Sequence, residues 1–336
     1  MLHRFIGILI IGISFLLAWL MMDFSQFRQA PLDLPPAGDV YILAPGSSVS
    51  GLARDLSNKG YLRSPVYLRV LARWKGLAQK IKAGEYQLQP GTTPEQLLEQ
   101  LVAGKVTSYS LTLVEGWNFR QLLAAVAEHP VLEHTLHGLS DQEIMKRLGH
   151  EGEHPEGRFL SDTYHFPRGS TDLALLGRAY DAMQQTLKEE WEKRETGLPL
   201  ESPYQALILA SIVEKETGLA SERAQISGVF IRRLKKGMLL QTDPTVIYGM
   251  GAEFDGNIRR RDLKRDTPYN TYLRKGLPPT PIAMPGVDAI RAALNPEKGK
   301  SLYFVAKGDG SHYFSDTLKQ HNNAVRKYQL KKKNND

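Results

Sequence analysis

The stretch SPYQALILASIVEKETG, residues 202–218, decides the fold of the larger, C-terminal part of the chain. Ser202 followed by Pro203 is a typical helix start, because the hydroxyl caps the helix and proline fits its first turn. Gly218 is typical of a helix end. Apolar residues between them cover most of the helix circumference, which predicts a helix buried at the centre of a core rather than an amphipathic surface helix.

Two carboxylates, Glu214 and Glu216, lie at the end of this helix. Side chains two positions apart point roughly 160° apart, so the pair cannot act together on one substrate. On a helical wheel, Glu216 falls inside the apolar stripe, stacked on Leu209 and Ile212, whereas Glu214 falls at its edge. Desolvation in that stripe should raise the pKa of Glu216 and make it a general acid at neutral pH. The alternative is a helix-end glutamate paired with an arginine or lysine.

Residues 238–246, 267–272 and 277–282 read as irregular loops rich in polar, aromatic and proline residues. Tyrosine rings stack on sugars, and asparagine and glutamine amides bond hydroxyl and N-acetyl groups. The loops therefore fit a carbohydrate cleft, although ordinary turn and packing chemistry fits them as well.

The N-terminus carries an unbroken apolar run of 18 residues, from Phe5 to Met22, which Asp23 ends. As a helix it spans roughly 27 Å, close to a bilayer core, with Trp19 near the interface. The run is too long for a typical signal peptide, and no clear cleavage site follows it. We therefore expect an uncleaved signal anchor over residues 1–22, with residues 23–336 outside the cytoplasmic membrane. A buried core helix is the alternative.

The rest of the chain predicts an α+β protein in several parts. Residues 23–38, with several prolines, read as a linker. Residues 39–105 read strand–helix–helix–strand–helix, which resembles a LysM-type sugar-binding module, with a plain packing domain as the alternative. Residues 106–330 form the expected catalytic domain, and residues 331–336 a basic tail.

Composition narrows the possible functions. The 336 residues suffice for two or three domains, and the absence of cysteine excludes disulfides, thiolate zinc sites and cysteine nucleophiles. The net charge of +7 fits solvated basic faces, or attraction to anionic lipid or peptidoglycan. No element interleaves basic and aromatic residues, so we expect no nucleic-acid binding.

Three motifs carry a family resemblance: ASIVEKET at 210–217, LQTDPTVIYG at 240–249 and YNTY at 269–272. They resemble the YceG-like family of endolytic murein transglycosylases, in the same order and behind the same N-terminal anchor. The resemblance runs from about residue 40 to 330 and is weakest before residue 160.

The resemblance assigns the catalytic glutamate to Glu216, the residue that the wheel favours. Glu216-Thr217, Gln241 and Tyr269-Asn270 are similar to the Glu-Ser, Gln and Tyr-Asn signatures of lysozyme-like lytic transglycosylases. That likeness implies a lysozyme-like catalytic helix. It makes Gln241, Tyr269 and Asn270, with Asp243 of the same motif, candidate substrate-binding residues that should line one groove with Glu216.

The implied activity is cleavage of the MurNAc–GlcNAc bond in nascent strands, leaving 1,6-anhydroMurNAc ends and terminating elongation. No metal, nucleotide or redox cofactor is implied. The implied partners are peptidoglycan glycan strands, the cytoplasmic membrane and, as a candidate, a peptidoglycan synthase. Two alternatives stay open. A hydrolytic muramidase would recruit Asp243 or Asp162 as a second carboxylate, and a non-catalytic scaffold would only bind peptidoglycan.

Overall fold

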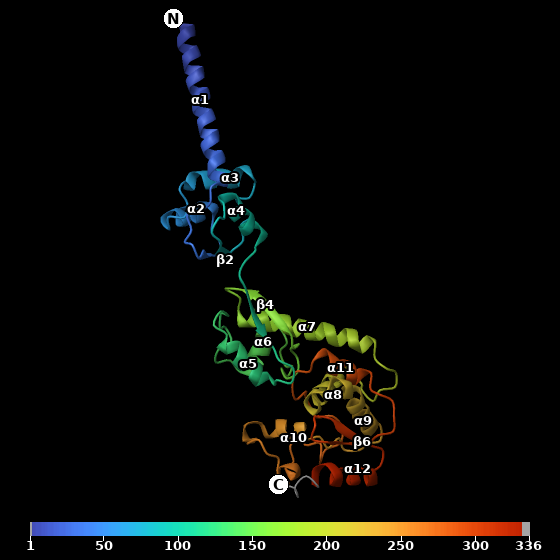
Figure 1. The fold of residues 1–336 in the computed structure, drawn as a ribbon. Helices are drawn as coiled ribbons and strands as arrows, with labels where there is room; N and C mark the ends of the chain where they lie inside the picture. The colour runs from blue at the N-terminus through green and yellow to red at the C-terminus, as the bar shows by residue number, and fades with distance from the viewer. Residues whose placement is uncertain (1, 331–336) are drawn as a thin grey trace. The chain divides into compact units, whose positions relative to one another are not determined.

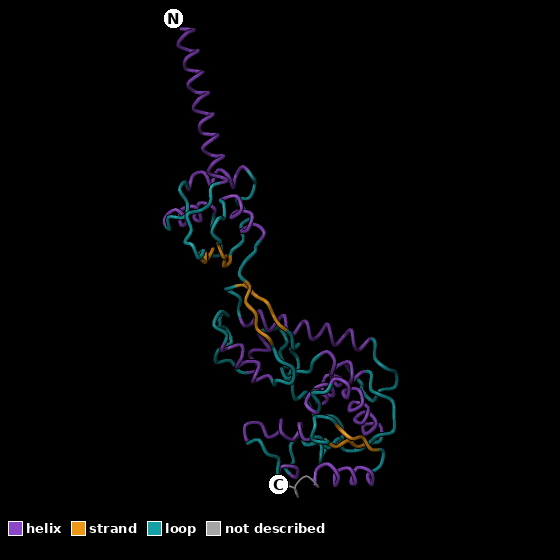
Figure 2. Tube along the Cα trace, viewed as in Figure 1, coloured by secondary structure: helices purple, strands orange, loops and turns teal. Residues whose placement is uncertain are grey.

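The computed structural model describes residues 2–330, which fall into two compact units. Unit 1 runs to Tyr109 and includes His165–Gly169, and unit 2 comprises Ser110–Tyr164 and the chain from Ser170 onward. Both units contain helices and strands, which confirms the predicted mixture (Figure 2). The predicted basic tail, 331–336, lies outside the described residues.

Helix α1 spans Leu2–Gln29 and contains the apolar run. It is long and apolar enough to cross a membrane, and its apolar window is not buried against the rest of the protein. The helix continues seven residues past Met22, so the predicted linker begins as a helix. The difference has a simple cause, since a carboxylate at Asp23 ends the apolar run without disturbing the backbone. The helix ends only where Pro31 disfavours the α conformation of the preceding residue.

The remainder of unit 1 follows the predicted order of strand, two helices, strand and helix. Its elements are β1 (Asp39–Leu43), α2 (Val49–Asn58), α3 (Pro65–Trp74), β2 (Gly84–Leu88) and α4 (Pro94–Ala103). Strands β1 and β2 are antiparallel, with Tyr41 opposite Tyr86. Both tyrosines join the leucines of the three helices in one hydrophobic core. Apolar residues at helical spacing thus bury one face of each helix against the two-stranded sheet.

Unit 2 is mainly helical, with short two-stranded sheets. Its first elements are β3 (Ser108–Thr112), α5 (Phe119–Glu128), α6 (Asp141–Arg147), β4 (Thr163–Pro167) and α7 (Asp172–Glu192). Then follow α8 (Pro203–Glu216), η1 (Ala220–Glu222), α9 (Arg223–Lys235), α10 (Asp243–Met250), η2 (Gly251–Glu253), η3 (Asp262–Lys264), α11 (Val287–Leu294), β5 (Tyr303–Ala306), β6 (His312–Ser315), α12 (Leu318–Val325) and the π-helical η4 (Arg326–Leu330). β3 pairs with β4 and β5 with β6, and the boundary between the units falls within β3 and β4.

Helix α8 is the centre of unit 2, as its sequence predicts. The Ser202 hydroxyl accepts the N–H of Gln205 and caps the helix, and every residue from 206 to 213 is buried. Helices α7, α9, α10 and α11 pack around it (Figure 1). The buried Ser211 hydroxyl accepts the N–H of Ile282 at 3.0 Å, which ties a proline-rich loop to the helix. This packing fixes the end of α8, where Glu216 lies.

Candidate active site

Glu216 is the last residue of α8, and its carboxyl group is surrounded by protein although the residue keeps some exposed surface. The Thr242 hydroxyl donates a hydrogen bond to Oε1 of Glu216. Burial raises the pKa of Glu216 to about 7, against the lowering effect of the Thr242 hydrogen bond, while the nearby Asp243 charge raises it further. A carboxyl with this pKa can both donate and accept a proton near neutral pH.

Thr242 is held in place by the motif around Thr271. The N–H of Thr242 donates to Thr271 Oγ1 at 3.1 Å, and the N–H of Gln241 donates to the Thr271 carbonyl at 3.1 Å. The Thr245 and Thr271 hydroxyls lie 2.9 Å apart. Segments almost thirty residues apart in the sequence are thereby joined beside the end of α8. The structure thus brings all three motifs together.

Gln241 has a backbone φ of 51°, the only positive value among the non-glycine residues that the structure describes. Residues other than glycine seldom adopt this conformation, and such strain concentrates at functional sites. The Gln241 side chain is exposed, next to the residue that hydrogen-bonds Glu216. An unusual backbone conformation therefore occurs at an exposed amide residue, directly before the residue that hydrogen-bonds Glu216.

Asp243 is exposed and is the first residue of α10. Its Oδ1 accepts a hydrogen bond from the Tyr272 hydroxyl at 2.5 Å. We expected an irregular loop here, and from Asp243 onward that expectation is wrong. The physical reason is visible in the sequence, since Pro244 suits the first turn of a helix. The helix fixes Asp243 close enough to Glu216 for its charge to raise that pKa.

Tyr269 lies half-buried against α10. Its ring centre is 4.8 Å from that of Tyr248, in an edge-on arrangement, and its hydroxyl lies 2.9 Å from Thr280 Oγ1. A Cβ on Gly249 would lie 3.2 Å from the Tyr269 Cβ and closer still to Thr267, so the motif glycine permits this approach.

Asn270 is fully buried, and its amide serves its own loop. Nδ2 donates to the carbonyls of Leu263 and Arg265, at 3.1 and 2.7 Å, and Oδ1 accepts the N–H of Tyr272 at 2.9 Å. These bonds occupy the groups that would otherwise reach a sugar. Asn270 thus holds its own loop together, and its direct contact with substrate stays a prediction.

Glu214 has a different environment from Glu216. Its side chain is 8 % exposed, and Oε2 accepts the N–H of Gly286 at 3.1 Å. The Arg223 guanidinium lies 3.7 Å from its other oxygen. Burial raises the pKa of Glu214 while these contacts lower it. Glu214 therefore anchors the segment before α11, in agreement with its position at the edge of the apolar stripe.

Glu156 is a buried carboxyl that the sequence analysis did not single out. It is 3 % exposed, accepts the N–H of Phe119 at 3.0 Å and accepts the Tyr248 hydroxyl at 3.0 Å. Burial raises the pKa of Glu156 to about 7. The neighbouring Gly157 has a φ of 76°, and a Cβ there would lie 2.5 Å from Pro281. The glycine is a sequence signal for a tight turn, but nothing local reveals the burial.

A cavity of about 660 Å³ opens beside Glu156. Its wall comes from the first turns of α5, the face of α10 and the loop around His154. Arg120 and Lys215 bring positive charge to it, and Tyr248 and Phe254 bring aromatic rings. Within residues 2–330 no group of three or more histidine or acidic side chains is placed to hold a metal ion.

Known proteins match this chain over nearly its whole length. The sequence matches the YceG-like family over residues 41–327. The chain belongs to the YceG-like family. It is 33% identical to the endolytic murein transglycosylase of Bacillus subtilis strain 168, over 95% of this chain and 91% of that protein. The endolytic murein transglycosylase of Streptococcus pneumoniae serotype 2 is 27% identical over 83% of the chain, which spans 56% of that longer relative.

The fold of this YceG-like chain is similar to the crystal structure of a YceG-like protein from Listeria monocytogenes. The TM-score is 0.54 at 30% identity, covering 86% of this chain and all of the Listeria chain. In this protein of known family, the carboxyl of Glu216 in the first motif accepts a hydrogen bond from the second motif, through Thr242.

Proposed function

We propose that this YceG-like chain is an endolytic lytic transglycosylase of peptidoglycan, with Glu216 as its acid and base. The relatives named endolytic murein transglycosylases support the activity. The observation that carries the assignment of Glu216 is its desolvated carboxyl, which takes one hydrogen bond from Thr242 and lies where the three motifs meet.

The reaction needs only one such group. Protonated Glu216 gives its proton to the glycosidic oxygen as the bond between MurNAc C1 and that oxygen breaks. The resulting carboxylate then takes the proton of the C6 hydroxyl of the same MurNAc, whose oxygen bonds to C1. Because the nucleophile is part of the substrate, proximity replaces the water that a hydrolase must position. Glu216 ends protonated, and the product is a 1,6-anhydroMurNAc end.

The surrounding residues then divide into two roles. We assign Gln241 and Asp243, both exposed, to contacts with sugar hydroxyl and N-acetyl groups, and the half-buried Tyr269 to contact with a sugar ring. Asn270 holds the loop that carries Tyr269 and Thr271. The end of α8 would act as the counterpart of a lysozyme-like catalytic helix.

In this proposal, unit 1 anchors the enzyme to the membrane and binds glycan strands. Helix α1 anchors the enzyme by a single pass, with the rest of the chain on the extracytoplasmic side. Residues 39–105 act as a LysM-like module that holds glycan strands, consistent with their antiparallel strand pair and three helices. Tethering near the bilayer would confine cleavage to nascent strands and so terminate their elongation, beside a peptidoglycan synthase.

Mass spectrometry of fragments released from uncrosslinked glycan strands tests the reaction. A transglycosylase gives anhydro-ended products that are lighter by one water than those of a muramidase. The hydrolytic alternative draws on Asp243, whose charge acts on Glu216. Reducing-end products that carry the added water, and that disappear in Asp243→Asn, would establish that alternative instead.

A reporter fusion tests the orientation. Alkaline phosphatase fused after residue 40 should be active, and a cytoplasmic reporter at the same place inactive, because the single apolar run ends at Met22. The reverse pattern would place the catalytic unit in the cytoplasm, away from peptidoglycan, and would refute the proposed substrate.

A further inference from the structure

Helix α3 carries an apolar row that stays largely exposed in unit 1. Leu68, Leu71 and Ala72 face the core. Val66, Val70 and Trp74 follow one another at intervals of four, and Val70 and Trp74 are 46% and 65% exposed. Residues four apart lie on one side of a helix, so the row is continuous.

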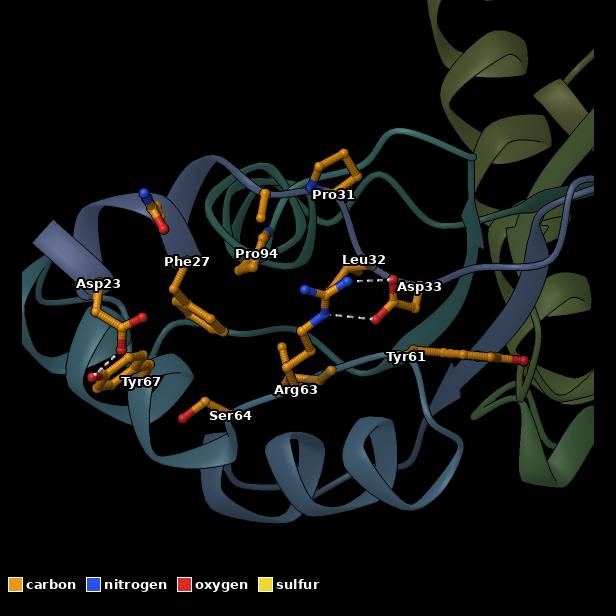
Figure 3. Close-up of a pocket in the computed structure, with 13 residues that line it drawn as sticks. Asp23, Phe27, Pro31, Leu32, Asp33, Tyr61, Arg63, Ser64, Tyr67 and Pro94 are labelled. Carbon is orange, nitrogen blue, oxygen red and sulfur yellow. Dashed lines mark hydrogen bonds and ion pairs between the residues drawn. The ribbon is translucent and has the colours of Figure 1, made fainter.

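Contacts with α1 hold α3 close to the point where the apolar run ends. The Phe24 ring lies 5.6 Å from Tyr67 and 6.5 Å from Trp74, both edge-on. The Tyr67 hydroxyl donates to Asp23 at 2.7 Å, and the Arg28 guanidinium lies 5.3 Å from the Trp74 ring. Figure 3 shows Asp23, Phe27 and Tyr67 together at one end of a pocket of about 320 Å³ in unit 1.

These contacts fix the distance of α3 from the end of the apolar run, and so from the membrane boundary. Residues 23–28 follow Met22 directly, and six residues of helix rise about 9 Å. Helices that lie in a membrane interface bury their apolar face about 5–10 Å into the boundary between headgroups and acyl chains. A membrane that α1 crosses therefore has its boundary within reach of α3.

The charges beside the row fit an anionic surface. Arg69 and Arg73 are exposed on the same helix, next to Val66 and Val70. Arginine near a membrane surface is attracted to anionic headgroups, and tryptophan is enriched at the interface. A soluble partner would also fit an apolar row, but the adjoining membrane helix, the tryptophan and the two arginines together favour lipid.

We propose that α3 is a second membrane contact, with Val66, Val70 and Trp74 in the interface of the leaflet that α1 leaves and with Arg69 and Arg73 on anionic lipid phosphates. This contact would fix unit 1 against the bilayer, whereas α1 alone would leave it free to tilt. The inference rests on α1 crossing a membrane and is independent of the catalytic assignment.

The chain has no cysteine, so single cysteines can be labelled cleanly. Val70→Cys and the control Val40→Cys each carry a nitroxide in the full chain, in nanodiscs of equal parts phosphatidylglycerol and phosphatidylcholine. Val40 is a matched control, since it is 43% exposed and lies in β1, at the end of unit 1 away from α1 (Figure 2). Collision with oxygen reports lipid, and collision with a water-soluble nickel chelate reports water.

The label at position 70 should collide with the chelate several-fold less, and with oxygen more, than the label at position 40. Arg69→Gln with Arg73→Gln, or nanodiscs of phosphatidylcholine alone, should move the label at position 70 towards water. Equal chelate collision at the two positions would overturn the proposal. Protection of position 70 from both reagents would also overturn it, because that result indicates a protein cover.

Discussion

Two carboxyl groups of unit 2, those of Glu216 and Glu156, have a pKa raised to about 7 by the same cause, burial. Their hydrogen bonds differ. Glu156 accepts the first N–H of α5 and the Tyr248 hydroxyl, so backbone and side chain both hold it. Glu216 accepts the Thr242 hydroxyl, and Thr242 lies between the exposed Gln241 and Asp243 in the sequence.

The difference teaches that a raised pKa alone does not identify the acid. A carboxylate at a helix N-terminus, bonded by N–H and hydroxyl donors, is typical of a structural brace. A carboxyl with spare hydrogen-bonding capacity at the end of a buried helix can still bond a leaving oxygen. We therefore assign catalysis to Glu216 and bracing of α5 and α10 to Glu156, and the following predictions test that division.

The largest expected effect is that of Glu216→Gln. Glutamine is isosteric but cannot give a proton to the glycosidic oxygen, and general acid–base catalysis contributes about 10²–10⁴-fold. Because the mechanism has no second group to replace it, the loss of anhydro-ended products should reach the upper end of that range. Folding should survive, since a neutral amide is easier to bury than a carboxylate. Product analysis and thermal melting check both parts.

Glu214→Gln is the matched control on the same helix. Its bonds go to Gly286 and Arg223, so substantial activity should remain. If Glu214→Gln were inactive and Glu216→Gln cleaved normally, the assignment of the acid would be wrong.

Thr242→Val should lower activity roughly 10- to 100-fold, because a hydrogen bond to a charged group is worth about 1.5–3 kcal/mol. The hydrogen bond from Thr242 lowers the pKa of Glu216. Loss of this bond should therefore raise that pKa and move the basic limb of the pH–rate profile to higher pH. Thr242→Ser keeps the hydroxyl and is the control. An unchanged limb in Thr242→Val would mean that this hydrogen bond does not set the acid's pKa.

Local signals in the sequence predicted much of this fold. A cap, a proline and a glycine marked α8 to within a residue or two, and the apolar residues around its circumference identified it as buried. The helical wheel distinguished Glu216 from Glu214, because the angle at which a side chain leaves a helix follows from its position in the sequence. Helix α10 was missed although Pro244 signalled it, since the polar residues around it are typical of loops.

Features that depend on contacts between distant segments could not be predicted from such local signals. The burial of Glu156 depends on α5 and α10, which are distant from it in the sequence. The amide of Asn270 could have faced a sugar or its own loop, and only the fold decides between them. The positive φ of Gln241 likewise arises from the pairing of its segment with Thr271.

Below pH about 7, where Glu156 is mostly protonated, Glu156→Gln should destabilise unit 2 by about 1 kcal/mol, because both carboxyl oxygens accept hydrogen bonds and the amide replaces one of them with an NH2 group. Activity should fall by no more than about threefold, because the group is not assigned to the reacting atoms. Thermal melting and initial rates of the full chain in detergent measure both. A loss of activity as large as that of Glu216→Gln, without a change in melting temperature, would make Glu156 a catalytic residue. The two carboxyls would then no longer differ in role.

The last comparison concerns the pH dependence of stability, which both carboxyls should share. Their pKa values are about 7 in the folded protein and near the ordinary 4.5 when unfolded. The folded state therefore binds more protons between these values, so stability is fully present below pH about 4.5 and falls as pH rises through about 7. Glu216→Gln and Glu156→Gln should each reduce part of this fall in melting temperature with rising pH, and the double variant should remove most of it.

The pH dependence of activity should separate the two carboxyls. The basic limb of the pH–rate profile should be the same in Glu156→Gln as in the parent enzyme, because only Glu216 must be protonated for bond cleavage. If Glu156→Gln moved that limb, the proton that matters for catalysis would be shared between the two sites.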